Sequence, residues 1–154
     1  MADIRHPDVN RMVEILGLSP HPEGGFYRET FRSSSTAIYF LLPAGEFSAF
    51  HRLRASDEIW HHYAGDPVEL ETIDSDGVHR VTILGSDLER GERPQAIVPA
   101  GTLQAAAVRG QRFALCGCTV TPAFDFADFE LPAREDLVAA FPRHEAVIRR
   151  LTRA

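Results

Sequence analysis

Three of the seven histidines in the chain fall within twelve residues, together with a carboxyl group and an indole. His51, His61 and His62 share this segment with Glu58 and Trp60. Imidazole and carboxyl groups are the side chains that most often move protons near neutral pH, and both also bind metal ions. The segment is therefore the first candidate for a functional site.

The alternation of side chains along a strand indicates which of these groups share one face. If Glu58 points into the protein, Trp60 and His62 follow it, whereas His61 and Tyr63 face the other side. We expect His61 to be an outward residue that makes hydrogen bonds at a strand surface or a subunit interface.

His51 and Glu58 form a candidate acid–base pair if the pocket holds no metal. A carboxylate beside an imidazole raises the pKa of the imidazole and lowers its own, which favours proton transfer near neutral pH.

A divalent metal is the alternative hypothesis for the same residues. His51 and Glu58 supply two ligands, and the carbonyl oxygen of Gln104 supplies a third. This set suits a hard cation better than zinc, and catalytic sites usually keep three firm protein ligands. His62 could add an imidazole by strand alternation. A metal-free pocket is the favoured hypothesis.

Five residues are candidates for contact with a ligand. Trp60 offers a flat surface on which a ring can stack, and Gln104 offers an amide. His62 shares the expected parity of the pocket wall, and Tyr39 faces either the same cavity or its reverse. Arg28 is expected at the pocket mouth, where it could pair with an anionic group.

The elements that must position these residues have the pattern of strands and turns. Between about residues 24 and 131, short runs rich in Val, Ile, Tyr, Phe and Thr alternate with Gly, Pro, Asp and Ser clusters. The runs predict strands over residues 26–33, 37–42, 48–53, 58–64, 68–73, 79–84, 96–98, 104–108 and 113–121. This spacing predicts a mainly β fold, an antiparallel jelly-roll barrel or sandwich that can enclose a small pocket.

Helical patterns occur only at the two ends of the chain. Apolar residues at helical spacing predict a helix over about 7–16, with Pro7 in its first turn and Gly17 at its end. Two short helices are predicted over about 134–152, with Pro142 between them. Because no linker divides the chain, residues 1–154 are expected to form a single domain.

Composition excludes several classes of protein. The 154 residues are 44% hydrophobic and carry a net charge of -6, which fits one globular domain. The basic residues do not cluster, so nucleic acid is not an expected partner. The longest apolar run, residues 37–42, is too short to cross a membrane. The first residues lack the apolar region of a secretory leader, so a cytoplasmic location is expected.

The two cysteines, Cys116 and Cys118, are predicted to be buried strand residues. Side chains two apart on a strand have poor geometry for a mutual disulfide, and no second pair exists to complete a structural zinc site.

The spacing around the histidines resembles the first motif of the cupin superfamily. Gly45, His51, Glu58 and Gly65 stand at the motif's positions, but its second histidine is replaced by Leu53. Residues 99–104 resemble the second motif, with Gln104 in place of its histidine. Because two of the usual three imidazoles are missing, the resemblance implies weak affinity for iron, copper or nickel.

Longer strings are similar to one cupin family, DUF985, also called cupin 5. They are EGGFYRET at residues 23–30, HR and SDEIWH within residues 51–61, and GCTV and FDFADFE within residues 117–130. The resemblance covers most of the chain. It implies a jelly-roll cupin, a homodimer and a central cavity, but it supplies no activity.

Metal-free cupins with a similar arrangement include sugar-nucleotide epimerases, in which a histidine removes a proton next to a carbonyl and a second residue protonates the opposite face. The resemblance implies that His51 is the general base and that Tyr39 or Tyr63 is the opposing acid. By this analogy we expect a small, carbohydrate-like metabolite in the cavity and an isomerase or epimerase reaction that His51 and Glu58 catalyse. The alternatives are a module that binds or senses a small molecule without chemistry, and a metal-dependent lyase or dioxygenase.

Overall fold

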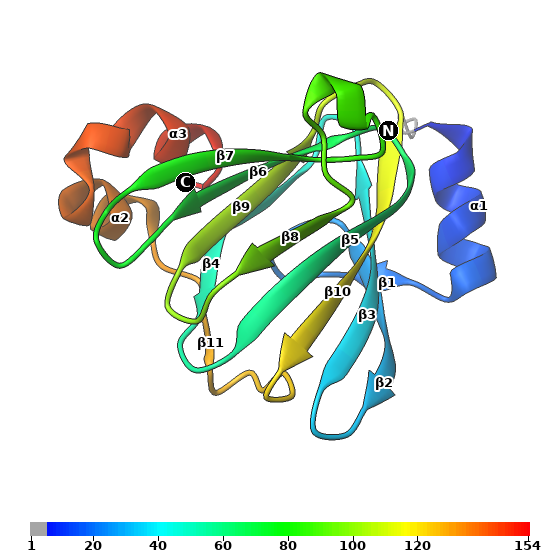
Figure 1. The fold of residues 1–154 in the computed structure, drawn as a ribbon, viewed down its shortest axis with the longest axis horizontal. Coiled ribbons are helices and arrows are strands. Elements are labelled where there is room, and N and C mark those ends of the chain that lie inside the picture. The colour runs from blue at the N-terminus through cyan, green and yellow to red at the C-terminus, as the bar shows by residue number, and fades with distance from the viewer. Residues whose placement is uncertain (1–5) are drawn as a thin grey trace.

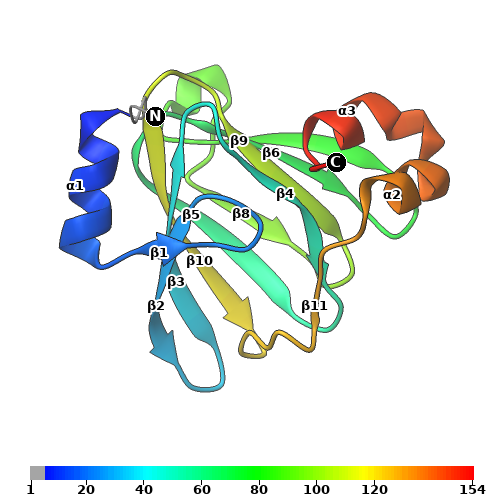
Figure 2. The ribbon, with the colours of Figure 1, turned by 180° about the vertical axis from the view of Figure 1, so that it is seen from behind.

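The computed structural model describes residues 6–154. Residues 1–5, which carry most of the segment on which the expected absence of a secretory leader rests, lie outside this description. The described chain is mainly β, as predicted, with short helices at its two ends (Figures 1 and 2). None of its helices is long and apolar enough to span a membrane.

The strands form two antiparallel sheets. Sheet I has six strands in the order β1 (Ser19–Pro20), β2 (Phe26–Arg32), β3 (Thr36–Pro43), β10 (Phe113–Thr121), β5 (Asp57–Gly65) and β8 (Gln95–Val98). Sheet II has five, in the order β11 (Phe129–Glu130), β4 (Phe47–Leu53), β9 (Leu103–Val108), β6 (Val68–Ile73) and β7 (His79–Leu84). The nine predicted strands are all present, whereas the two-residue strands β1 and β11 were not predicted.

The two sheets enclose the main core. Inward side chains alternate along their strands, as Phe40 and Leu42 do on β3 and Cys116 and Cys118 do on β10. Leu70 on β6 meets them from sheet II. Both cysteines are buried and free, which confirms their prediction as ordinary strand residues. Full burial of one large apolar side chain contributes roughly 1.5–3 kcal/mol.

The edges of the two sheets meet differently on their two sides. On one side, a single parallel bridge between Leu84 and Arg93 connects the end of β7 to the chain before β8. On the other side, the turn between β1 and β2 reaches across to β4, where the Ala49 amide donates to the Glu23 carbonyl oxygen. Within residues 6–154 no pairing between named strands joins the sheets, so a closed barrel stays a prediction.

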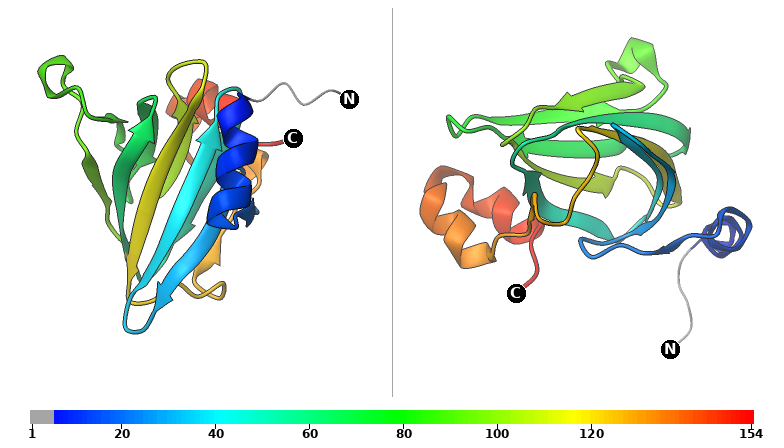
Figure 3. Two further views of the ribbon diagram at one scale, coloured as in Figure 1. Left: turned by 90° about the vertical axis from the view of Figure 1, so that its right-hand side faces the viewer. Right: turned by 90° about the horizontal axis from the view of Figure 1, so that it is seen from below.

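The terminal helices cover opposite sides of the molecule (Figure 3). Helix α1 (Pro7–Leu16) has the predicted bounds, with Gly17 in the left-handed conformation at its end, and it packs beside Leu41 and Phe113 of sheet I. Helices α2 (Arg134–Ala140) and α3 (Glu145–Arg150) pack on the outer face of sheet II. Two 3-10 turns, η1 (Leu88–Arg90) and η2 (Pro142–His144), complete the elements, the second at the predicted break.

Candidate functional site

A small cavity opens where the turn between β1 and β2, the strand β4 and the segment after β10 come together. The space open to the centre of a water-sized sphere is about 80 Å³. Its lining consists of His21, Glu23, Tyr27, Glu29, Arg32, Thr36, Ile38, Phe40, His51, Leu53, Glu58, Trp60, Cys118, Val120, Phe124, Phe126 and Phe129. Such a wall, mostly apolar with a few converging polar groups, is typical of a small-molecule site.

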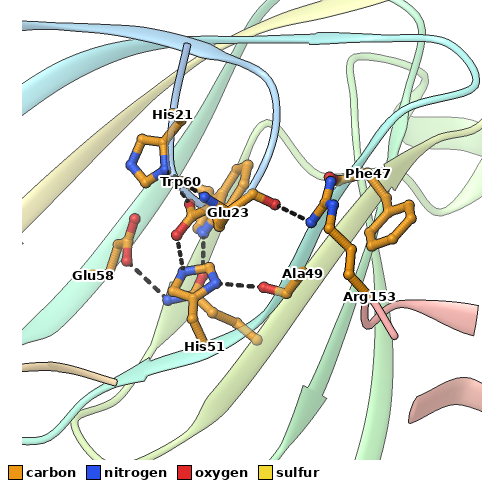
Figure 4. Close-up of polar contacts among 9 residues, drawn as sticks. His21, Glu23, Phe47, Ala49, His51, Glu58, Trp60 and Arg153 are labelled. Carbon is orange, nitrogen blue, oxygen red and sulfur yellow. Dashed lines mark hydrogen bonds and ion pairs between the residues drawn. The ribbon is translucent and has the colours of Figure 1, made fainter. Parts of the chain in front are cut away.

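His51 is held on β4 in one orientation and one tautomer (Figure 4). Its Nδ1 lies 2.8 Å from the carbonyl oxygen of Ala49, and because a carbonyl can only accept, Nδ1 carries the hydrogen. The ring also stacks against Phe129, with 5.5 Å between the ring centres. Nε2 is therefore left with a free electron pair on the cavity side.

The carboxyl group next to this electron pair belongs to Glu23, which sequence reasoning did not assign to the site. Glu23 Oε2 lies 3.4 Å from His51 Nε2, and both side chains are buried. Oε2 has no hydrogen-bond partner of normal geometry in the described chain, although the nearby Ser48 hydroxyl tends to lower the pKa of Glu23. The available signal was an acid directly before a glycine pair in the string EGGFYRET.

The backbone around Glu23 is fixed from several directions. Its carbonyl oxygen accepts from the Ala49 amide and from Nη1 of Arg153, each at 2.8 Å. Gly24 has a φ of +120°, and a Cβ there would overlap the Phe47 carbonyl oxygen. Gly24 therefore lets the chain approach β4 closely.

His21 lies on the far side of the Glu23 carboxyl group. Its Nδ1 accepts from the Glu23 amide at 3.2 Å and stands 3.5 Å from Glu23 Oε1. Its ring meets the edge of Tyr27, with 4.5 Å between the ring centres. Both His21 and Tyr27 line the cavity, and neither was predicted as a site residue.

Burial decides the charge states of these groups. Desolvation lowers the pKa of His51 to about 4 and that of His21 to about 3. Desolvation also raises the pKa of Glu58, and it raises that of Glu23 well above the usual value for a glutamate. The expectation that His51 and Glu58 would shift each other's pKa toward the charged forms is therefore wrong, because the cost of burying a charge dominates.

Glu58, Trp60 and Gln104 form a hydrogen-bonded chain beside the cavity. The indole Nε1 of Trp60 donates to Gln104 Oε1 at 2.7 Å, and Gln104 Nε2 donates to Glu58 Oε1 at 2.8 Å. Trp60 and Glu58 line the cavity, whereas Gln104 lies behind them and fixes their orientation. The structure thus brings these three predicted site residues together, with the amide bonded to its two neighbours.

Three predicted ligand contacts, Arg28, Tyr39 and His62, lie away from the cavity. Arg28 and Tyr39 face each other across β2 and β3 on the outer side of sheet I, where Arg28 Nη1 donates to the Leu16 carbonyl oxygen. Their neighbours Ile38 and Phe40 point inward instead.

His62 does not line the cavity. It pairs with Cys116 just before the register shift in the pairing of β5 with β10, near the end of β5, and its Nε2 lies 2.8 Å from the Asp66 carbonyl oxygen. Tyr63, the other predicted acid, is 56% exposed and stacks on His61. His61 faces outward as expected, with Nε2 2.8 Å from the Thr119 hydroxyl.

The predicted metal ligands do not fit a metal centre. Gln104 points its amide hydrogens at Glu58 and receives the Trp60 hydrogen on its oxygen, so the amide already serves both neighbours. Among residues 6–154, no group of three or more His, Cys, Asp or Glu side chains is arranged to hold a metal ion. We therefore assign the chemistry of the site to its side chains alone.

Two antiparallel sheets enclosing a small cavity, with a histidine on β4 and a glutamate on β5 at its wall, define a protein of the cupin class. Within that class the chain belongs to the Cupin_5 family, described as Cupin superfamily (DUF985), whose model matches residues 10–132.

Two solved structures are similar to this chain over nearly their whole length. A protein from Shewanella oneidensis is 42% identical with a TM-score of 0.90, over 97% of this chain and 99% of that one. A hypothetical protein from Leishmania major is 34% identical with a TM-score of 0.90, over 94% and 98%.

More distant likeness extends to an enzyme. Oxalate decarboxylase from Bacillus subtilis shares the fold, with 14% identity and a TM-score of 0.59 over 86% of this chain and 36% of that one. No curated protein matches the sequence.

Proposed function

We propose that this protein binds a small, carbohydrate-like metabolite in the cavity and catalyses a proton transfer of the isomerase or epimerase type. The observation that carries the proposal is the state of His51. Its Nδ1 is tied to the Ala49 carbonyl oxygen, so Nε2 faces the cavity as a proton acceptor whose position is fixed. A base held in one tautomer within reach of a bound substrate is the first requirement of general base catalysis.

The electrostatics indicate what kind of proton this base can remove. A pKa of about 4 means that Nε2 is unprotonated at neutral pH, but it also makes the imidazole a weak base. A weak base removes only an activated proton, such as one on a carbon next to a carbonyl group whose oxygen receives a hydrogen bond. Aromatic side chains at the mouth, Phe124, Phe126 and Phe129, favour exclusion of water during the transfer.

Glu58 has a supporting role in this proposal. It accepts a hydrogen bond from Gln104, which also holds the Trp60 indole, so the three residues set the shape and polarity of one wall. The flat face of Trp60 suits the ring of a carbohydrate-like ligand.

A binding module without chemistry is the second candidate, and one observation favours it. Burial disfavours the charged forms of the imidazoles and carboxyl groups in the cavity, which suits retention of an uncharged ligand as well as its conversion.

Deuterium exchange separates the two candidates even while the natural substrate is unidentified. The protein is incubated in D₂O with a panel of aldoses, ketoses and cyclic ketones, and NMR records which carbon-bound hydrogens are replaced. We expect exchange next to a carbonyl in at least one compound, reduced at least about 100-fold by His51→Gln. A compound that binds but never exchanges would favour the binding module. Exchange undiminished in the folded His51→Gln variant would refute the role of His51.

A further inference from the structure

Two hydrogen-bond acceptors face each other inside the cavity. His51 Nδ1 uses its hydrogen on Ala49, so Nε2 of the neutral ring presents an electron pair. Glu23 Oε2 stands 3.4 Å away, buried and without a hydrogen-bond partner in the described chain. Two unshared electron pairs this close in a dry environment repel, and a proton on one of the two atoms relieves that repulsion.

The surroundings favour Glu23 as the holder of that proton. With the proton on His51, the protein would bury an imidazolium and a carboxylate, which is costly. His21 offers no hydrogen to that carboxylate, because its Nδ1 already accepts from the Glu23 amide. The Ser48 hydroxyl and the Arg153 charge lower the pKa of Glu23, but burial and the second buried acid, Glu58, have the larger effect and raise it, and the Arg153 guanidinium donates its hydrogen bonds to backbone carbonyls.

We propose that Glu23 holds this proton against His51 Nε2 and presents it to the carbonyl oxygen of an uncharged substrate. The catalytic part of the proposal rests on the proton-transfer function proposed above. Glu23 is then the acid that works with His51, at the carbonyl oxygen, whereas the two predicted acids, Tyr39 and Tyr63, lie away from the cavity.

The reaction balances with the groups present. When the substrate binds, the Glu23 hydrogen bond moves from His51 Nε2 to the substrate carbonyl oxygen, which frees the Nε2 electron pair. His51 Nε2 then takes a proton from the carbon next to the carbonyl, while Glu23 gives its proton to the carbonyl oxygen. The products of this step are an enol, an imidazolium and a carboxylate, and the reverse movements restore all three partners. The pair remains neutral overall at each stage, so the cavity never gains net charge.

The charge pattern of the wall supports an uncharged substrate. Of the described residues that line the cavity, Arg32 is the only arginine or lysine. Its guanidinium binds both carboxylate oxygens of Glu29, at 2.6 and 2.8 Å, so its charge is largely offset. A phosphate or carboxylate on the ligand would instead meet Glu23 and Glu58 without a free cation.

Infrared spectroscopy tests where the proton resides, without any substrate. At pH 7, the difference spectrum of wild type minus Glu23→Gln should contain the C=O stretching band of a protonated carboxylic acid. The matched control is Glu71→Gln, because Glu71 is equally buried but paired with His79 and Arg150. Its difference spectrum should contain carboxylate bands instead. Carboxylate bands for Glu23 would overturn the proposal.

The His51 ring reports the same proton in the unmodified protein. Long-range ¹H–¹⁵N correlation spectra at pH 7 should show hydrogen on Nδ1 alone, with Nε2 shifted as a hydrogen-bond acceptor. A ring protonated on both nitrogens would overturn the proposal even if Glu23→Gln did not fold.

Exchange measurements then test the catalytic part. With a compound that exchanges in D₂O, Glu23→Gln should lower the exchange rate at least about 100-fold and leave its binding within about tenfold, because the amide donates a hydrogen bond but transfers no proton. Unchanged exchange would overturn the role of Glu23. Absence of exchange in the wild type would refute the proposed function, while the two spectroscopic results would still decide which group holds the proton.

Discussion

Gly24 controls the distance between Glu23 and the strand that carries His51. Its φ of +120° is unfavourable for any residue with a side chain, and a Cβ would also overlap the Phe47 carbonyl oxygen and approach Arg153 Nη2 to 2.8 Å. The position therefore tolerates neither a change of conformation nor added volume.

Gly24→Ala should lower the free energy of unfolding by at least about 2 kcal/mol and move Glu23 away from His51. Gly101→Ala is the control, because Gly101 has a φ of +81° but nothing within 4 Å of the added methyl group. Chemical denaturation should show a loss of only about 1 kcal/mol for this control. Equal losses for the two variants would contradict the close approach at Gly24.

Of the two residues that face each other in the cavity, the spacing of the motif predicted His51 but not Glu23. The residues from His51 to Trp60 belong to two consecutive strands, so strand alternation predicted that Glu58 and Trp60 share the inner face, as they do. Glu23 was not predicted as a site residue because it approaches His51 from a turn 28 positions earlier in the sequence, and a turn has no periodic pattern of residues. His62 was misplaced because alternation predicts the face of a residue but not its place along the strand, and His62 lies near the end of β5, against Asp66.

Among the elements, the C-terminal tail stabilises the turn that carries the acid. Arg153 Nη1 donates to the Glu23 carbonyl oxygen and Nη2 to the Phe47 carbonyl oxygen, while the guanidinium lies 4.3 Å from the centre of the Phe47 ring. The last residues of the chain thus connect the β1–β2 turn to β4.

Arg153→Ala should lower the free energy of unfolding by about 1 kcal/mol, since two hydrogen bonds to carbonyls are lost on a partly exposed surface. Hydrogen exchange should speed up at the Ala49 amide, which donates to the same Glu23 oxygen. Arg153→Lys serves as the comparison because it keeps the charge but cannot reach both carbonyls in one plane. Unaltered exchange at Ala49 in the alanine variant would show that the tail does not hold the turn.

Element boundaries were predictable where several signals agreed. Proline at the start, helical spacing and a terminal glycine indicated α1 at residues 7–16, and alternating runs indicated the nine longer strands. Strands β1 and β11 have two residues each, too few for any periodicity, and they form because their neighbours β2 and β4 offer free edges.

For the molecule as a whole, buried histidines couple stability to pH. Folding lowers the pKa of His21 from 6.5 to about 3. Between these two pH values the His21 imidazole is therefore protonated in the unfolded chain but neutral in the native protein. The stabilisation from neutral His21 is complete above pH 6.5 and is lost as pH falls toward 3.

His21→Asn should therefore reduce acid sensitivity. Between pH 7 and pH 4 the wild type should lose on the order of 3 kcal/mol more unfolding free energy than the variant, in which an amide oxygen can still accept from the Glu23 backbone. Denaturant titrations at each pH provide the measurement. Parallel pH profiles for the two proteins would show that His21 is not the group responsible.

We also propose that the protein forms a homodimer through the outer face of sheet I. Beyond the end covered by α1, this sheet exposes apolar side chains that include Phe31, Tyr63 and Ile97, with exposures of 57%, 56% and 69%. A patch of this kind on a sheet is typical of an interface between subunits.

Sedimentation velocity should give twice the chain mass of 17.1 kDa. Ile97→Asp should shift the protein to the monomer, whereas Leu88→Asp, at a residue 59% exposed on η1, should not. A wild-type monomer at micromolar concentration would refute the dimer.

The hydrogen bond from Trp60 to Gln104 has a practical consequence. Trp60 is the only tryptophan in the chain, it lies in the cavity wall, and its indole is 2.7 Å from an amide oxygen. Its fluorescence therefore arises from a single, rigid environment directly beside the place where a ligand would sit. A shift or quenching of the Trp60 emission can therefore report ligand binding, and compound collections can be screened without any attached dye.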